Sequence, residues 1–212
     1  MNNELKKRII SSFILTPIVF FSIIKGSYIF ISLIFICFLI SVYEWNMMSK
    51  YKLYKIPGFI FIILSFFTIH KLRINLENDF WYFIIVILIC IGSDIGGYLF
   101  GNLFKGPKLS KFSPKKTYSG MIGAFILPIT LIIILKNYIL IEAYLNINWI
   151  IFVILISLTS QLGDIIISYF KRLSKIKDTG KIIPGHGGIL DRIDGMIFAF
   201  PLSYIIQLIN FI

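Results

Sequence analysis

Charged residues are scarce in this chain of 212 residues: they make up 15% of it, and only ten are acidic, whereas 58% of the residues are hydrophobic. Soluble domains carry about 25% charged residues, so the composition excludes an ordinary soluble protein. Cysteine is scarce as well. Cys37 and Cys90 both lie inside apolar runs without metal-ligand spacing, and we interpret them as small buried side chains.

Long apolar runs dominate the remainder of the chain. Runs of about 18 or more apolar residues indicate membrane helices. We predict an all-α, polytopic integral membrane protein with about seven transmembrane helices, at roughly 9–24, 27–45, 57–70, 80–101, 119–140, 148–170 and 188–212. Residues 1–212 are expected to form a single membrane domain, with N-terminal helices in 1–80 and the site-bearing helices and cytoplasmic loops in 81–212.

The basic residues, which give a net charge of +11, are distributed unevenly. If the N-terminus is cytoplasmic and the helices alternate in direction, all but four of the 21 Lys and Arg residues fall on the cytoplasmic side. This asymmetry follows the positive-inside rule. A nucleic-acid partner is not expected, because no basic motif sits in a soluble fold. Anionic lipid headgroups suit these loops better.

Four aspartates, Asp94, Asp164, Asp191 and Asp194, lie inside apolar runs. At a rise of about 1.5 Å per residue, all four lie within two helical turns of one membrane face. Asp164, Asp191 and Asp194 flank one short loop and are expected to converge, and such a cluster of hard oxygen ligands suits Mg²⁺. Pairing of each aspartate with a nearby Lys or Arg, and ion transport, are the alternatives.

The loop between these helices, KRLSKIKDTGKIIPGHGG, is both basic and rich in glycine. Lys171, Arg172 and Lys177 would make its mouth positive. Gly187 and Gly188 permit close backbone approach and precede a helix N-terminus, which favours anions. We predict that the loop binds phosphate groups and that His186 contacts one of them.

A second cytoplasmic loop, FKGPKLSKFSPKKTYSG, contains Ser113, Lys115, Lys116 and Thr117. It is not a Walker A loop, because G-x-x-x-x-G-K-[ST] is absent. We predict that it completes the same pocket together with Asp94. The alternative is a basic loop whose lysines only extend to the membrane surface.

The segment from Ser168 to Asp194 resembles the signature of the phosphatidate cytidylyltransferases (CDP-diacylglycerol synthases). Eleven fixed positions of that signature are matched, by Ser168, Lys171, Arg172, Lys177, Asp178, His186, Gly187, Gly188, Asp191, Arg192 and Asp194. The SPKKT stretch is similar to the family's upstream motif. Tyr118, Ser119 and Gly120 stand where the family usually has Trp-Glu-Gly, so a role of that Glu cannot be transferred.

The resemblance implies an enzyme, a nucleotidyltransferase of phospholipid biosynthesis that converts CTP and phosphatidate to CDP-diacylglycerol and diphosphate. It implies Mg²⁺ held by Asp164, Asp191 and Asp194, with a second, monovalent cation such as K⁺. A homodimer, a bacterial inner-membrane location and a site facing the cytoplasm would be in keeping with the family. The predicted catalytic residues are Asp164, Asp191, Asp194, Lys171 and Arg172, and the predicted substrate-binding residues are Asp94, Ser113, Lys115, Lys116, Thr117, Lys177, Asp178, His186, Gly187, Gly188 and Arg192.

Two other functions compete with this one. A transferase of the CDP-alcohol phosphatidyltransferase type also uses clustered aspartates, but its D-G-x-x-A-R arrangement is missing, since Met196 and Ile197 follow Asp194-Gly195. An ion-coupled transporter would need access to the membrane centre from both sides. The four aspartates inside the apolar runs lie near one face only.

Overall fold

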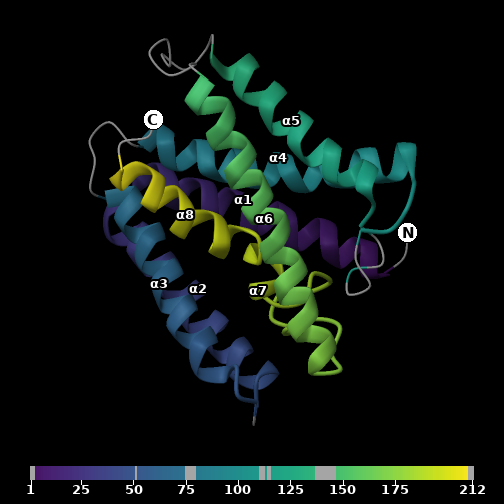
Figure 1. Ribbon diagram of the computed structural model, residues 1–212. Helices are drawn as coiled ribbons and strands as arrows, with labels where there is room; N and C mark the ends of the chain where they lie inside the picture. Colours follow the sequence, from purple (N-terminus) through teal and green to yellow (C-terminus); the bar gives the residue numbers. More distant parts are fainter. Residues whose placement is uncertain are drawn as a thin grey trace. The chain divides into compact units, whose positions relative to one another are not determined.

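The computed structural model describes residues 3–50, 52–74, 80–109, 113, 116–136 and 147–209. Over these ranges the chain is mainly helical and contains no strand, which confirms the all-α prediction (Figure 1). The helices are α1 (Asn3–Lys25), α2 (Ser27–Met48), α3 (Lys55–Ile74), α4 (Phe80–Phe104), α5 (Tyr118–Lys136), α6 (Ile147–Leu173), α7 (Leu190–Ile193) and α8 (Met196–Leu208).

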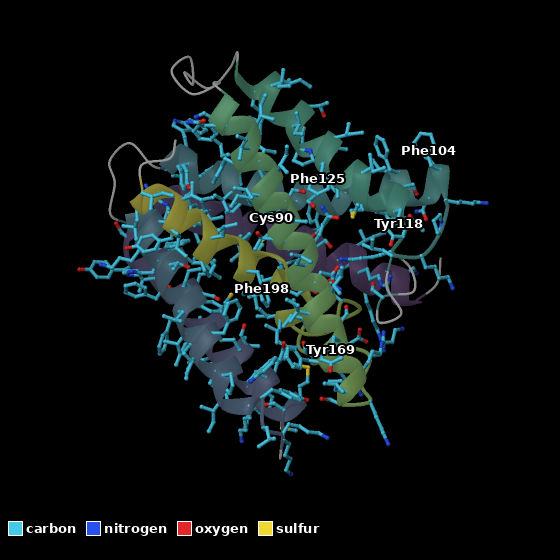
Figure 2. All side chains as sticks on the ribbon, viewed as in Figure 1. Cys90, Phe104, Tyr118, Phe125, Tyr169 and Phe198 are labelled. Carbon is cyan, nitrogen blue, oxygen red and sulfur yellow. The ribbon has the colours of Figure 1, made fainter. Side chains whose placement is uncertain are left out.

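Six of these helices, α1 to α6, are long and apolar enough to cross a membrane, and α8 is a shorter apolar helix. Their outward faces carry large apolar side chains, as Phe13, Tyr28 and Leu103 illustrate with exposed fractions above two thirds. Phe104 and Tyr118 are further exposed examples (Figure 2). Apolar exposure on this scale does not suit water, and it confirms a polytopic membrane protein.

The described contacts group the chain into two compact units. The first comprises residues 1–77 and 170–193, so the three N-terminal helices share it with α7 and with the loop 174–189, called the signature loop below. Within it, α2 and α3 lie side by side (Figure 1). Phe30, Ile62 and Leu72 form its buried core. The guanidinium of Arg73 donates to the carbonyl of Ile23 at 2.8 and 3.1 Å, and thereby satisfies a carbonyl near the end of α1.

The second unit comprises residues 78–169 and 194–212. Here α4 and α5 lie side by side (Figure 1), and they approach through small residues. A Cβ atom at Gly96 would collide with the carbonyl of Gly123. Phe83, Phe152 and Ile156 are buried in this unit. Whether the two units make one membrane domain stays a prediction.

The last predicted helix, 188–212, is two helices in the structure. It is interrupted between Ile193 and Met196, and α8 has only 13 residues. Gly195 lies at the interruption, where a Cβ atom would collide with the hydroxyl of Ser160 on α6. The interruption therefore coincides with a close approach of the backbone to α6.

Candidate active site

The signature loop begins where α6 ends and is folded by its own backbone. Ile183 and Gly187 exchange two hydrogen bonds, of 2.9 and 3.2 Å, and His186 N–H also donates to the carbonyl of Ile183. Gly185 and Gly187 have φ values of +76° and +92°, which favour glycine. The sequence GHG thus makes a tight turn, which leads directly to α7.

Asp191 is the centre of a hydrogen-bond network in the first unit. Its Oδ1 accepts a hydrogen bond from the ammonium of Lys171 at 2.8 Å. Its Oδ2 accepts from the backbone N–H groups of Thr179 and Gly188 at 2.7 and 3.0 Å. The side chain of Asp191 is only 4% exposed. Two predicted catalytic residues, Lys171 and Asp191, are therefore in direct contact.

The surroundings of Asp191 favour its ionised form. Burial acts to raise the pKa of this carboxyl group. The hydrogen bond and charge of Lys171, with the N–H groups of Gly188 and Thr179, outweigh burial, so the pKa lies below its ordinary value. Asp191 is thus an anion held in one orientation.

Glu44 was missed by the sequence reasoning. This α2 residue is 1% exposed, and its carboxylate accepts three hydrogen bonds from the signature loop and α7. The donors are the hydroxyl of Thr179 at 2.8 Å and the N–H groups of Ile189 and Leu190 at 3.0 and 2.9 Å. The available signal was a single acidic residue inside an apolar helix, far in sequence from the loop.

Helix α1 also contacts the signature loop. Arg8 donates to the carbonyl of Gly185 at 2.9 Å. Ser11 and Ser12 lie within hydrogen-bond distance of the two ring nitrogens of His186, at 2.8 and 3.3 Å. His186 was predicted to contact phosphate, and in this structure both of its ring nitrogens lie within hydrogen-bond distance of serine hydroxyls on α1. Its role with substrate stays a prediction.

Most other predicted residues of the first unit are exposed around this network. Arg172, Lys177, Asp178 and Arg192 have exposed side chains. Arg192 donates to the carbonyl of His186 at 2.7 Å, and Arg172 donates to that of Ile176 at 3.3 Å. Arg172, Lys177 and Arg192 therefore supply a basic surface beside the buried Lys171–Asp191 pair.

The second unit contains the other half of the predicted site. Lys116, from the SPKKT stretch, forms an ion pair of 2.6 Å with Oδ2 of Asp164 on α6. Ser168 donates to Oδ1 of the same carboxylate at 3.2 Å. Lys116 of the SPKKT stretch therefore contacts one of the aspartates inside the apolar runs, while completion of a substrate pocket by this loop and Asp94 stays a prediction.

The hydroxyls near the SPKKT stretch have local structural partners. Thr117 accepts a hydrogen bond from Gly120 N–H at 3.1 Å, which caps the start of α5. Ser119, one of the departures from the family pattern, donates to the carbonyl of Lys105 and so closes the loop. The carbonyl of Ser113 accepts from Lys116 N–H. Lys115 lies outside the described residues.

Asp194 and Asp94 also belong to the second unit. Oδ1 of Asp194 accepts a hydrogen bond from Gly195 N–H at 2.9 Å, at the start of α8. A Cβ atom at Gly163 would lie 2.8 Å from the carbonyl of Asp194, so the backbones approach closely beside Asp164. Asp94 lies on α4 with an exposed side chain.

The predicted magnesium ligands are divided between the units, with Asp191 in the first and Asp164 and Asp194 in the second. Among the residues that the structure describes, no three His, Cys, Asp or Glu side chains are gathered as a metal site. Their convergence on one ion therefore stays a prediction. What the structure shows is that Asp164 and Asp191 each contact a lysine ammonium.

Fold and site together define a polytopic membrane protein with a basic, glycine-containing loop closed around buried carboxylates. A sequence model of the Cytidylyltransferase family matches residues 6–73 and 56–209. The chain belongs to this family, which confirms the resemblance inferred from the signature.

Named relatives agree with this assignment. The phosphatidate cytidylyltransferase of Rickettsia bellii is 34% identical over 212 residues, which cover 97% of this chain and 91% of the relative. That of Rickettsia typhi is 37% identical, over 93% of this chain and 89% of the relative. That of Staphylococcus epidermidis is 39% identical over 127 residues, which cover 59% of this chain and 48% of the relative.

Proposed function

We propose that this chain is a phosphatidate cytidylyltransferase, which transfers the cytidylyl group of CTP to phosphatidate and releases diphosphate. The observation that carries this proposal is the similarity to enzymes of that name over nearly the whole chain, the signature loop included. The geometry supports it, since Lys171, Gly188 and Asp191 of the signature form one hydrogen-bonded network.

The reaction is proposed to be an in-line displacement at phosphorus. A phosphate oxygen of phosphatidate attacks the α-phosphorus of CTP, and the bond from that phosphorus to the bridging oxygen breaks, so that diphosphate leaves with the electron pair. The nucleophile is already an anion and needs no general base. Positioning and charge neutralisation then account for most of the catalysis. The exposed basic residues Arg172, Lys177 and Arg192 suit binding of these phosphates.

The chemistry of the site suits a divalent cation. Carboxylate oxygens are ligands that Mg²⁺ prefers, and Asp164 and Asp191 already hold cationic lysine groups at 2.6 and 2.8 Å. Asp164, Asp191 and Asp194 would hold the ion. When bound, the ion neutralises charge on the phosphates. A monovalent cation and a homodimer stay predictions.

The two substrates are proposed to arrive by different routes. Basic residues gather on both site-bearing loops, which by the positive-inside rule face the cytoplasm, where CTP is found. Phosphatidate would enter sideways from the bilayer, because its acyl chains stay among the lipids. Labelling of a cysteine placed at Lys181 with a membrane-impermeant maleimide, in inverted and right-side-out vesicles of a Cys37→Ala, Cys90→Ala background, tests this orientation. Labelling from the outer side only would contradict it.

The catalytic assignment is tested by Asp191→Asn. The amide retains one oxygen for the N–H groups of Thr179 and Gly188 but offers Lys171 no anion. We expect formation of CDP-diacylglycerol to fall below detection. The variant should be less stable, because Lys171 loses its anion, but it should still insert and elute from size exclusion as the wild type does. Activity near that of the wild type would contradict the role of Asp191.

A further inference from the structure

We infer that Glu44 is a positioning residue: from α2 it fixes the segment 179–191 and, through that segment, the carboxylate of Asp191. The two carboxylates share one set of loop donors. Consecutive N–H groups are divided between them, with that of Gly188 donated to Asp191 and those of Ile189 and Leu190 donated to Glu44.

The burial of Glu44 argues for a specific role. A carboxylate that is 1% exposed loses its hydration, and this is costly unless hydrogen bonds replace the lost water. All three donors that replace it, Thr179, Ile189 and Leu190, come from the signature loop and its continuation into α7. The carboxylate is therefore oriented by this segment, and the segment by the carboxylate.

Two glycines of the loop lie so close to Glu44 that neither position has room for a side chain, which is an independent observation. A Cβ atom at Gly180 would lie 2.5 Å from Oε1 of Glu44. A Cβ atom at Gly188 would collide with both oxygens of the same carboxylate. A side chain at either position would displace Glu44 or the loop, so the Gly188 that sequence reasoning assigned to phosphate approach also makes room for this carboxylate.

Thr179 connects the two carboxylates directly. Its hydroxyl lies 2.8 Å from Oε2 of Glu44 and 3.1 Å from Oδ2 of Asp191. A hydroxyl has one proton to donate, so Thr179 can donate to only one of the two carboxylates at a time. A displacement of either carboxylate therefore changes the hydrogen bond that the hydroxyl makes with the other. Loss of Glu44 would release the Ile189 and Leu190 N–H groups on one side of Asp191 and leave this hydroxyl to one partner. The direction in which Oδ1 of Asp191 faces Lys171 would then be less firmly fixed.

The catalytic part of this inference rests on the proposed function, whereas the structural part does not. Glu44→Gln tests both parts, because an amide presents a nitrogen to at least one of the three donors. Ser41→Ala is the matched control on the same helix, where the buried hydroxyl donates only within α2. Ile62→Ala, in the core of the same unit, controls for a general loss of stability.

The first measurement is amide hydrogen exchange in detergent without substrate. For Glu44→Gln we expect exchange to accelerate by about tenfold or more in peptides covering 179–193, because one of the Ile189 and Leu190 N–H groups, which donate to different oxygens of Glu44, loses its acceptor. Peptides from α3 should exchange as in the wild type. Ile62→Ala should accelerate exchange throughout the unit. A wild-type pattern for Glu44→Gln, or one spread like that of Ile62→Ala, would overturn the inference.

The second measurement is steady-state kinetics. We expect kcat of Glu44→Gln to fall by roughly 10- to 100-fold, as removal of a group that orients a ligand commonly does, while KM for CTP changes little. Ser41→Ala and Ile62→Ala should keep the wild-type kcat per folded enzyme. A local change of exchange with an unchanged kcat would also overturn the inference. If the wild type forms no CDP-diacylglycerol, the proposed function fails while the exchange result still decides the structural part.

Thr179→Val takes over the test if Glu44→Gln does not accumulate as folded protein. It removes only the hydroxyl shared by Glu44 and Asp191, and Thr179→Ser restores that hydroxyl. The inference requires that Thr179→Val accelerates exchange in 179–193 and lowers kcat. It also requires that Thr179→Ser does neither. Equal behaviour of the two variants would overturn it.

Discussion

The ammonium of Lys171 lies 2.8 Å from Oδ1 of Asp191, and the two side chains are only 11% and 4% exposed. This pair links the last turn of α6 to α7 across the signature loop. The corresponding contact in the second unit, between Lys116 and Asp164, is 2.6 Å long but leaves both side chains more than a quarter exposed. The two pairs should therefore respond differently to the same kind of substitution.

Lys171→Met is expected to lower the stability of the protein substantially. Removing one partner of a buried ion pair leaves the other charge unpaired and costs about 3 kcal/mol or more. Thermal unfolding in detergent measures this, and Lys171→Arg serves as the charge-preserving control with a smaller loss. Equal melting temperatures for Lys171→Met and the wild type would show that the pair does not stabilise the first unit.

Lys116→Met is expected to leave stability nearly unchanged, because a partly exposed ion pair contributes about 1 kcal/mol or less. Its effect should appear in turnover, since Lys116 is the part of the SPKKT loop that reaches Asp164. The measurement is kcat/KM for CTP together with the melting temperature, and Lys116→Arg should retain most activity. A large loss of stability without a loss of turnover would contradict this separation.

The packing of α4 on α5 can be tested with two neighbouring glycines. Gly96→Ala should lower the melting temperature, because the added methyl group collides with the carbonyl of Gly123. Gly97→Ala is its matched control, since the nearest atom there, the carbonyl oxygen of Gly120, lies at an ordinary 3.7 Å. Similar melting temperatures for the two variants would mean that the close approach at Gly96 does not determine the packing.

Much of the fold could be predicted from the sequence, because a helix that crosses the membrane needs a long run of apolar residues, and such runs are visible in the sequence. The six long helices appear where the apolar runs predicted them, with α1 and α3 longer than expected at their ends. The interruption before α8 could not be predicted. Gly195 stands inside an apolar run, and its significance comes from the closeness of Ser160, which depends on the folded arrangement.

The site was predictable where the chemistry is concentrated in one segment. Lys171, Gly188 and Asp191 could be inferred to act together from their pattern, and the structure connects them by hydrogen bonds. Glu44 could not be found in this way. A lone acidic residue near the end of an apolar helix forms no pattern, and its partners Thr179 and Leu190 are more than 130 residues away in sequence.

The most direct test of the central claim is an assay of the purified protein with phosphatidate, Mg²⁺ and CTP labelled at the α-phosphorus. Label should move into a lipid that co-migrates with CDP-diacylglycerol, at a rate that depends on both substrates and is lost in Asp191→Asn. Label that stays with the nucleotide across lipid compositions and salt concentrations, with folded wild-type protein present, would contradict the proposed function.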